Sequence, residues 1–152
     1  MKKSLYSRNF EVNYYEVEDN IWKVISHLKD LQHDIRIIVD VSVPDMIILD
    51  AKIELLRYPM KDCVSINDKI KKLIGVNIIS SEFIPKCDEL FCGEMGCGNV
   101  RMLLGISVPG IIYSYFPYQI KIGNMTENQW WDFCKEKLPN ACIAHSLMSN
   151  NA

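Results

Sequence analysis

The chain has 152 residues, of which 49% are hydrophobic and 24% charged, and its formal net charge is -2. This length and balance are typical of one soluble globular domain with a real hydrophobic core. Lysines and arginines are scattered, so the basic stripe of a nucleic-acid-binding surface is excluded. We expect a single domain over residues 1–146 and a disordered tail at residues 147–152.

The first third of the chain predicts four strands. Alternating or β-branched segments are separated by short turn signals, such as EDN at residues 18–20 and PD at residues 44–45. Short reversals between consecutive strands indicate an antiparallel meander. The four segments are RNFEVNYYEV, IWKVISHL, HDIRIIVDVSV and MIILDAKIELLRYP.

The next part of the chain predicts a helix followed by an irregular segment. Asp62 is expected to cap a helix over residues 63–74, which Gly75 ends. We place Cys87 and Cys92 in the irregular segment that follows.

Two further helices are expected. Apolar residues over 100–115 recur at the spacing of a core-facing helix, and Pro109 should kink it. Thr126 and Gln129 match a capping box, and Pro139 closes the helix that follows. The expected fold class is therefore α+β: an antiparallel meander of about four strands in the N-terminal half, packed by two to three helices of the C-terminal half.

Neither a leader nor a membrane span is expected. The opening residues MKKSLYSRNF lack the apolar segment of a signal peptide, so we expect a cytoplasmic protein. The apolar run at residues 100–120 is about long enough to cross a bilayer, but Arg101 interrupts it and the preceding sheet needs a covering helix.

The six cysteines suggest a sulfur site. In a reducing compartment they should be free thiols or metal ligands, although each could also simply fill core space. Cys63 and Cys97 would each stand at a helix N-terminus, where unpaired N–H groups stabilise a thiolate. Gly96 and Gly98 on either side of Cys97 would give it room. The six positions are Cys63, Cys87, Cys92, Cys97, Cys134 and Cys142.

Several short motifs together resemble the bacterial domain-of-unknown-function family 2889, over about residues 4–118. Where that family has a histidine two residues after its Gly-Cys, this chain has Asn99. Since the family has no settled function, the resemblance implies a fold rather than an activity. The matching elements are Ser7-Arg8, Leu28-Lys29-Asp30, His33-Asp34, Arg57-x-Pro59 with Cys63, and Gly96-Cys97.

A fainter similarity of pattern links the chain to iron–sulfur scaffold proteins of the NifU/IscU type. Those proteins also have a short antiparallel sheet followed by two helices that each open on a cysteine, here Cys63 and Cys97. Their early cysteine-glycine-aspartate loop is missing, and His33-Asp34 stands roughly in its place. Such an analogy of order is weak support for function.

These observations favour a small cytoplasmic metal- or iron–sulfur-binding accessory or scaffold protein. Its ligands would be Cys63 and Cys97, with Cys92 and His33 next, and its cofactor zinc, iron or an iron–sulfur cluster. A partner protein or a homodimer is compatible with this function, whereas nucleic acid and membrane are not expected.

Two alternatives stay open. One is an enzyme with Cys97 as nucleophile, His33 as base and Asp34 as its orienting group. The other is a non-catalytic interaction domain whose aromatic residues dock a partner. Those aromatic residues are Tyr113, Tyr115, Trp130 and Trp131.

Overall fold

The computed structural model describes residues 3–150, with side chains up to residue 146. The backbone falls into two compact units, Met1–Ile111 and Ile112–Ala152. The predicted disordered tail, residues 147–152, lies outside the described side chains and stays a prediction. Among the described residues, no helix has the length and apolar character needed to cross a membrane.

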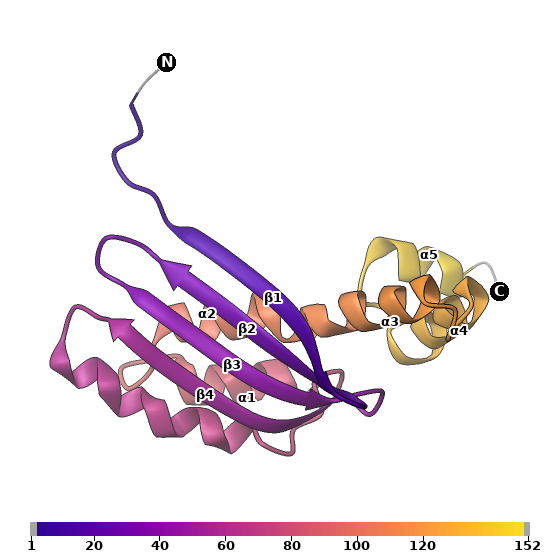
Figure 1. Cartoon of the computed structure of the whole chain (residues 1–152), viewed down its shortest axis with the longest axis horizontal. Helices are drawn as coiled ribbons and strands as arrows, with labels where there is room; N and C mark the ends of the chain where they lie inside the picture. Colours follow the sequence, from indigo (N-terminus) through magenta and orange to yellow (C-terminus); the bar gives the residue numbers. More distant parts are fainter. Residues whose placement is uncertain (1–2, 151–152) are drawn as a thin grey trace. The chain divides into compact units, whose positions relative to one another are not determined.

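The first unit is built on one antiparallel sheet, which confirms the predicted meander and the α+β class (Figure 1). Its strand order is β1-β2-β3-β4, and each strand pairs with the next along the chain. Alternation of side chains across the pleat gives the sheet a buried face and a more polar one. The strands are β1 (Asn9–Glu18), β2 (Ile21–Lys29), β3 (Asp34–Ser42) and β4 (Ile47–Arg57).

Helices cover one face of this sheet (Figure 1). They are η1 (Lys61–Leu73), α1 (Phe83–Phe91) and α2 (Gly98–Ser107). On α2 the buried residues follow the predicted helical spacing, so this helix packs its apolar stripe against β2 and β3. The core beneath the helices consists mainly of aliphatic residues, including Val24, Leu28, Ile37, Val39, Ile70, Leu103 and Leu104.

Two details of the predicted helices are wrong. The helix η1 is a 3-10 helix that begins at Lys61, with Met60 as its N-cap, so Asp62 does not cap it. The segment around Cys87 is the helix α1 rather than irregular chain, because Phe83, Cys87 and Leu90 form an apolar stripe that buries this helix.

The second unit, as far as residue 150, contains three α-helices. The short 3-10 helix η2 (Pro109–Ile111) interrupts the helical run, as Pro109 predicts. The chain then continues as α3 (Ile112–Lys121), α4 (Glu127–Lys137) and α5 (Ile143–Asn150). The predicted capping box is confirmed: Thr126 accepts a hydrogen bond from the backbone of Gln129, whose side chain accepts one from the backbone of Thr126.

Candidate functional site

Cys63 and Cys97 line the same pocket. Cys63 lies in the first turn of η1, and Cys97 is the N-cap of α2. Both residues are partly exposed, and both contribute to a pocket of about 320 Å³. The structure therefore brings together, at two helix N-termini, the two cysteines on which the sequence-based hypothesis rests.

The loop before α2 holds Cys97 in place by backbone contacts. The N–H of Cys97 donates to the carbonyl oxygen of Phe91 over 2.9 Å. A Cβ atom at Gly96 would overlap that same carbonyl, so only glycine fits there. Space around Gly98 is open, so only one of the two flanking glycines is required. Neither has the positive φ that favours glycine.

The opposite wall of the pocket is tied to this loop. The ammonium group of Lys69 on η1 donates a hydrogen bond to the carbonyl oxygen of Met95. The contact joins the helix that carries Cys63 to the loop that carries Cys97. It is therefore a direct polar link between the two walls.

Two methionines complete the sulfur lining, and sequence reasoning missed them. Met60 and Met95 both line the pocket, and they are 65% and 71% exposed. Each shortly precedes a pocket cysteine, so the signal available in the sequence was the pair of Met-x-x-Cys and Met-x-Cys spacings. Two carboxylate residues, Asp62 and Glu94, also line the pocket.

Cys92 is not part of this pocket lining. Its thiol lies 3.5 Å from Asp88, and partial loss of hydration together with this contact raises the pKa of Cys92. Arg101, in the first half of α2, pairs with the same Asp88. Asp88 thus contacts both Cys92 and Arg101 at the end of α1. In α1, burial raises the pKa of Cys87 to about 11.

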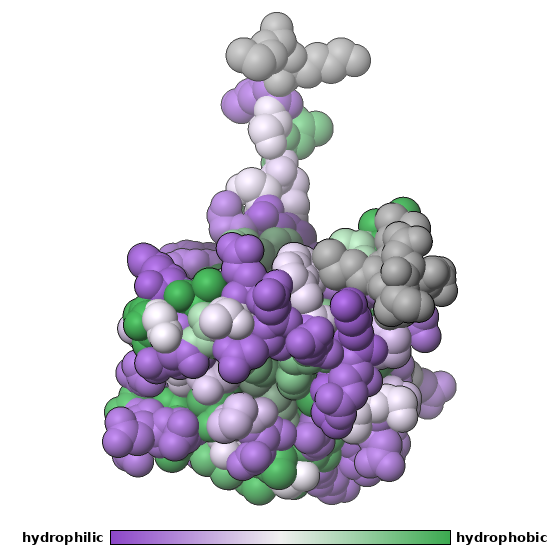
Figure 2. Space-filling model, turned by 90° about the vertical axis from the view of Figure 1, so that its right-hand side faces the viewer, coloured by the Kyte–Doolittle hydropathy of each residue, from purple (hydrophilic) through white to green (hydrophobic). Residues whose placement is uncertain are grey.

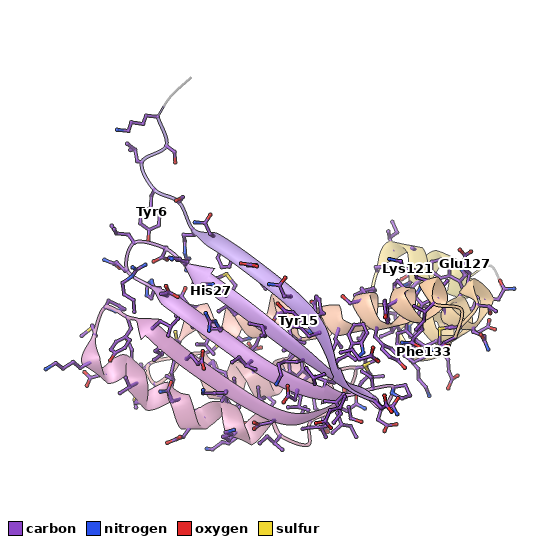
Figure 3. The ribbon with its side chains drawn as sticks, viewed as in Figure 1. Tyr6, Tyr15, His27, Lys121, Glu127 and Phe133 are labelled. Atoms are coloured by element: carbon purple, nitrogen blue, oxygen red, sulfur yellow. The ribbon has the colours of Figure 1, made fainter. Side chains whose placement is uncertain are left out.

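His33 belongs to a polar network at one end of the sheet. Its Nδ1 lies 3.1 Å from the carboxylate of Asp30, which also accepts hydrogen bonds from the backbone N–H groups of Gln32 and His33. Asp34, expected to orient His33, lies 2.6 Å from His27 instead. His27 sits on the sheet face that the helices leave open (Figure 3). Asp30 is therefore the carboxylate that contacts the His33 ring, and Asp34 contacts His27.

Two arginines extend this network: Arg8 lies just before β1, and Arg57 ends β4. Arg8 donates to Asp30 over 3.0 Å and to the side chain of Asn99 over 2.5 Å. Arg57 donates to the backbone carbonyls of Asp30 and His33. The start of β1, the β2–β3 turn, the end of β4 and the start of α2 are thus joined. Four residues of the motifs behind the family resemblance, Arg8, Asp30, His33 and Arg57, therefore meet at this end of the sheet.

Asp30 is the centre of the network. Its side chain is 1% exposed. Burial raises the pKa of this carboxyl, but hydrogen bonds from the backbone of His33 and Gln32 and from the His33 ring outweigh it and hold the pKa at about 2. A larger pocket of about 650 Å³ touches Asp30. Within that pocket the carboxylate is already held by hydrogen bonds from Arg8, Gln32 and His33.

The pocket cysteines and His33 do not form a ready metal site. Within the described part of the chain, no three His, Cys, Asp or Glu side chains are close enough to hold a metal ion together. The roles of Cys92 and His33 as further ligands stay predictions. The enzyme alternative also lacks its key contact, because no hydrogen bond between His33 and the Cys97 sulfur occurs among those residues.

The aromatic residues expected on a docking surface are partly core. Trp130 is only 8% exposed and stacks on Phe116, with ring centroids 4.9 Å apart. Tyr113 packs edge-on against Trp130 at 6.4 Å, and 47% of Tyr113 is exposed. In the surface view of Figure 2, hydrophobic residues lie in small groups between hydrophilic ones. Trp130 therefore stabilises the second unit and is not available for docking.

Comparison with known proteins gives one match. A family described as "Protein of unknown function (DUF2889)" matches residues 6–109. No curated protein and no solved structure matches the chain. The similarity of pattern to iron–sulfur scaffolds therefore gains no support from these comparisons.

Proposed function

The chain belongs to the DUF2889 family, and from its two-cysteine pocket we propose that it is a small accessory protein that binds a thiophilic metal ion. The single observation that carries this proposal is the convergence of Cys63 and Cys97 on one pocket. Zinc, iron and iron–sulfur clusters all accept thiolate ligands. The reducing cytoplasm is the compartment in which such thiols stay available.

The surroundings of the two sulfurs suit cation binding. Each cysteine stands at a helix start, where backbone N–H groups stabilise a thiolate. The carboxylates of Asp62 and Glu94 add negative charge at the pocket and attract a metal cation. Cys87, by contrast, is buried with its pKa raised to about 11, so it stays a thiol.

The pocket geometry favours a carrier or scaffold over a resident structural site. Structural zinc sites are closed by four protein ligands, whereas here two thiols open onto one surface pocket. A partner protein or a second copy of the chain would supply the remaining ligands. Incomplete coordination is what allows a metal ion to be passed on.

Cadmium titration tests the proposal, because thiolate coordination gives a charge-transfer absorption band. Reduced, metal-free protein is titrated with Cd²⁺ under anaerobic conditions, beside the variants Cys63→Ser and Cys97→Ser. We expect the wild type to bind about one Cd²⁺ ion per chain, and the Cd²⁺ affinity of either variant to be lower by about tenfold or more.

Cys92→Ser is the matched control, since Cys92 is exposed and lies outside the pocket lining. It should bind Cd²⁺ like the wild type. The proposal fails if the wild type shows no thiolate band, or if Cys92→Ser weakens binding as much as the two pocket variants do.

A further inference from the structure

We propose that the metal ion of this pocket is monovalent copper, with the thioethers of Met60 and Met95 joining the thiolates of Cys63 and Cys97. The inference rests on the proposed function and adds the identity of the ion. The observation behind it is that both walls of one pocket carry a thiol and a thioether.

Packing does not explain the positions of the two methionines. Methionine is usually buried, where its flexible thioether fills gaps in a core. Here Met60 and Met95 expose 65% and 71% of their surface. Each lies on a different wall, Met60 before η1 and Met95 in the loop before α2. Exposed thioethers on both sides of a thiol pair form a soft-ligand set that burial does not account for.

The donor set discriminates between metals. Zinc prefers four ligands drawn from cysteine, histidine and carboxylate; Asp62 and Glu94 line the pocket beside the two cysteines, but no three such side chains of the described chain lie close enough to hold one ion. Monovalent copper prefers thiolate and thioether sulfur, and those are the donors that this pocket presents from both walls. With two thiolates, a single positive charge leaves the site anionic, and Lys69 approaches the same loop as a counter-charge.

Contacts at the surface, rather than packing in the core, hold the two walls of the pocket. Lys69 joins η1 to the Met95 carbonyl, and the hydrogen bond from the Cys97 N–H to the Phe91 carbonyl holds the same loop against α1. Both methionine side chains project from this fixed frame into solvent-accessible space, so they can move onto an ion without disturbing packed residues.

The test compares copper and zinc binding in a methionine variant. Metal-free, reduced protein is titrated anaerobically with Cu⁺ against a chromophoric Cu⁺ chelator, and separately with Zn²⁺ against a zinc-binding dye. The double variant Met60→Leu with Met95→Leu keeps side-chain volume at exposed positions, so folding should be unaffected. Met125→Leu, a thioether outside the pocket lining, is the control.

We expect the double variant to lose about tenfold or more in Cu⁺ affinity, with Zn²⁺ affinity changed less than about twofold. Met125→Leu should match the wild type in both titrations. An unchanged Cu⁺ affinity in the double variant, or an equal loss for Zn²⁺, overturns the copper assignment and leaves the thiolate pocket standing. If Cys63→Ser and Cys97→Ser also bind Cu⁺ like the wild type, the proposed function fails as well.

Discussion

Replacing Asp30 by asparagine tests the polar network that joins the strands to α2. The substitution keeps the shape of the side chain and removes its charge. The pKa of Asp30 is about 2, against an ordinary value of 3.8. At about 1.4 kcal/mol per pH unit, this difference makes the ionised carboxylate contribute about 2 kcal/mol to the free energy of unfolding. Solvent screens little of it, since the side chain is 1% exposed.

The contribution depends on pH in a defined direction. Because the folded-state pKa lies below the unfolded one, the stabilisation is complete above about pH 5 and falls as the pH drops toward 2, with about half remaining at pH 3. Urea unfolding followed by circular dichroism should therefore show Asp30→Asn less stable than the wild type by about 2 kcal/mol at pH 6 and about 1 kcal/mol at pH 3.

The exposed Asp68 on η1 provides a matched control. Asp68→Asn should change stability by no more than about 0.5 kcal/mol at either pH. A penalty for Asp30→Asn that is equal at pH 6 and pH 3 would refute the reasoning, because it would show that the charge of Asp30 does not carry the effect.

Two further predictions concern the cysteines and their loop. Gly96→Ala should lower the free energy of unfolding by about 1–3 kcal/mol, because the added Cβ overlaps a backbone carbonyl. Gly98→Ala has open space around it and should leave the thermal midpoint unchanged or slightly raised. Equal thermal midpoints for the two variants would contradict the loop geometry. In a thiol titration at pH 8, Cys87 and Cys134 should react only once the protein is unfolded, because burial raises the pKa of each thiol to about 11. Rapid reaction of these two thiols in the folded protein would contradict their burial.

The strands were predictable because their signals are local. Alternation and turn residues define β1 to β4, and the helical spacing after Val100 defines α2. The helix α1 was missed although Phe83, Cys87 and Leu90 have helical spacing, and Pro85 lies in its first turn. Proline is tolerated in the first turn of a helix, where its missing N–H has no partner to lose.

The site was predictable only in part. The rule that places a thiol at a helix start selected Cys63 and Cys97 from six cysteines. This rule does not predict which side of the fold each helix start faces. It therefore gives no reason to group Met60 and Met95 with Cys63 and Cys97. The role of His33 as a ligand stays a prediction, and the turn that follows β2 places its ring beside Asp30. Such short-range competition depends on backbone geometry that a pattern of residue types does not contain.

The edge strand β1 has a consequence for solubility. No strand of the described chain pairs with the outer side of β1, so peptide groups along its ten residues are open to a foreign strand. Glu11, Glu16 and Glu18 stand on this strand, and mutual repulsion of their charges opposes the stacking of one molecule on another. These glutamates therefore oppose association of two molecules through this edge of the sheet.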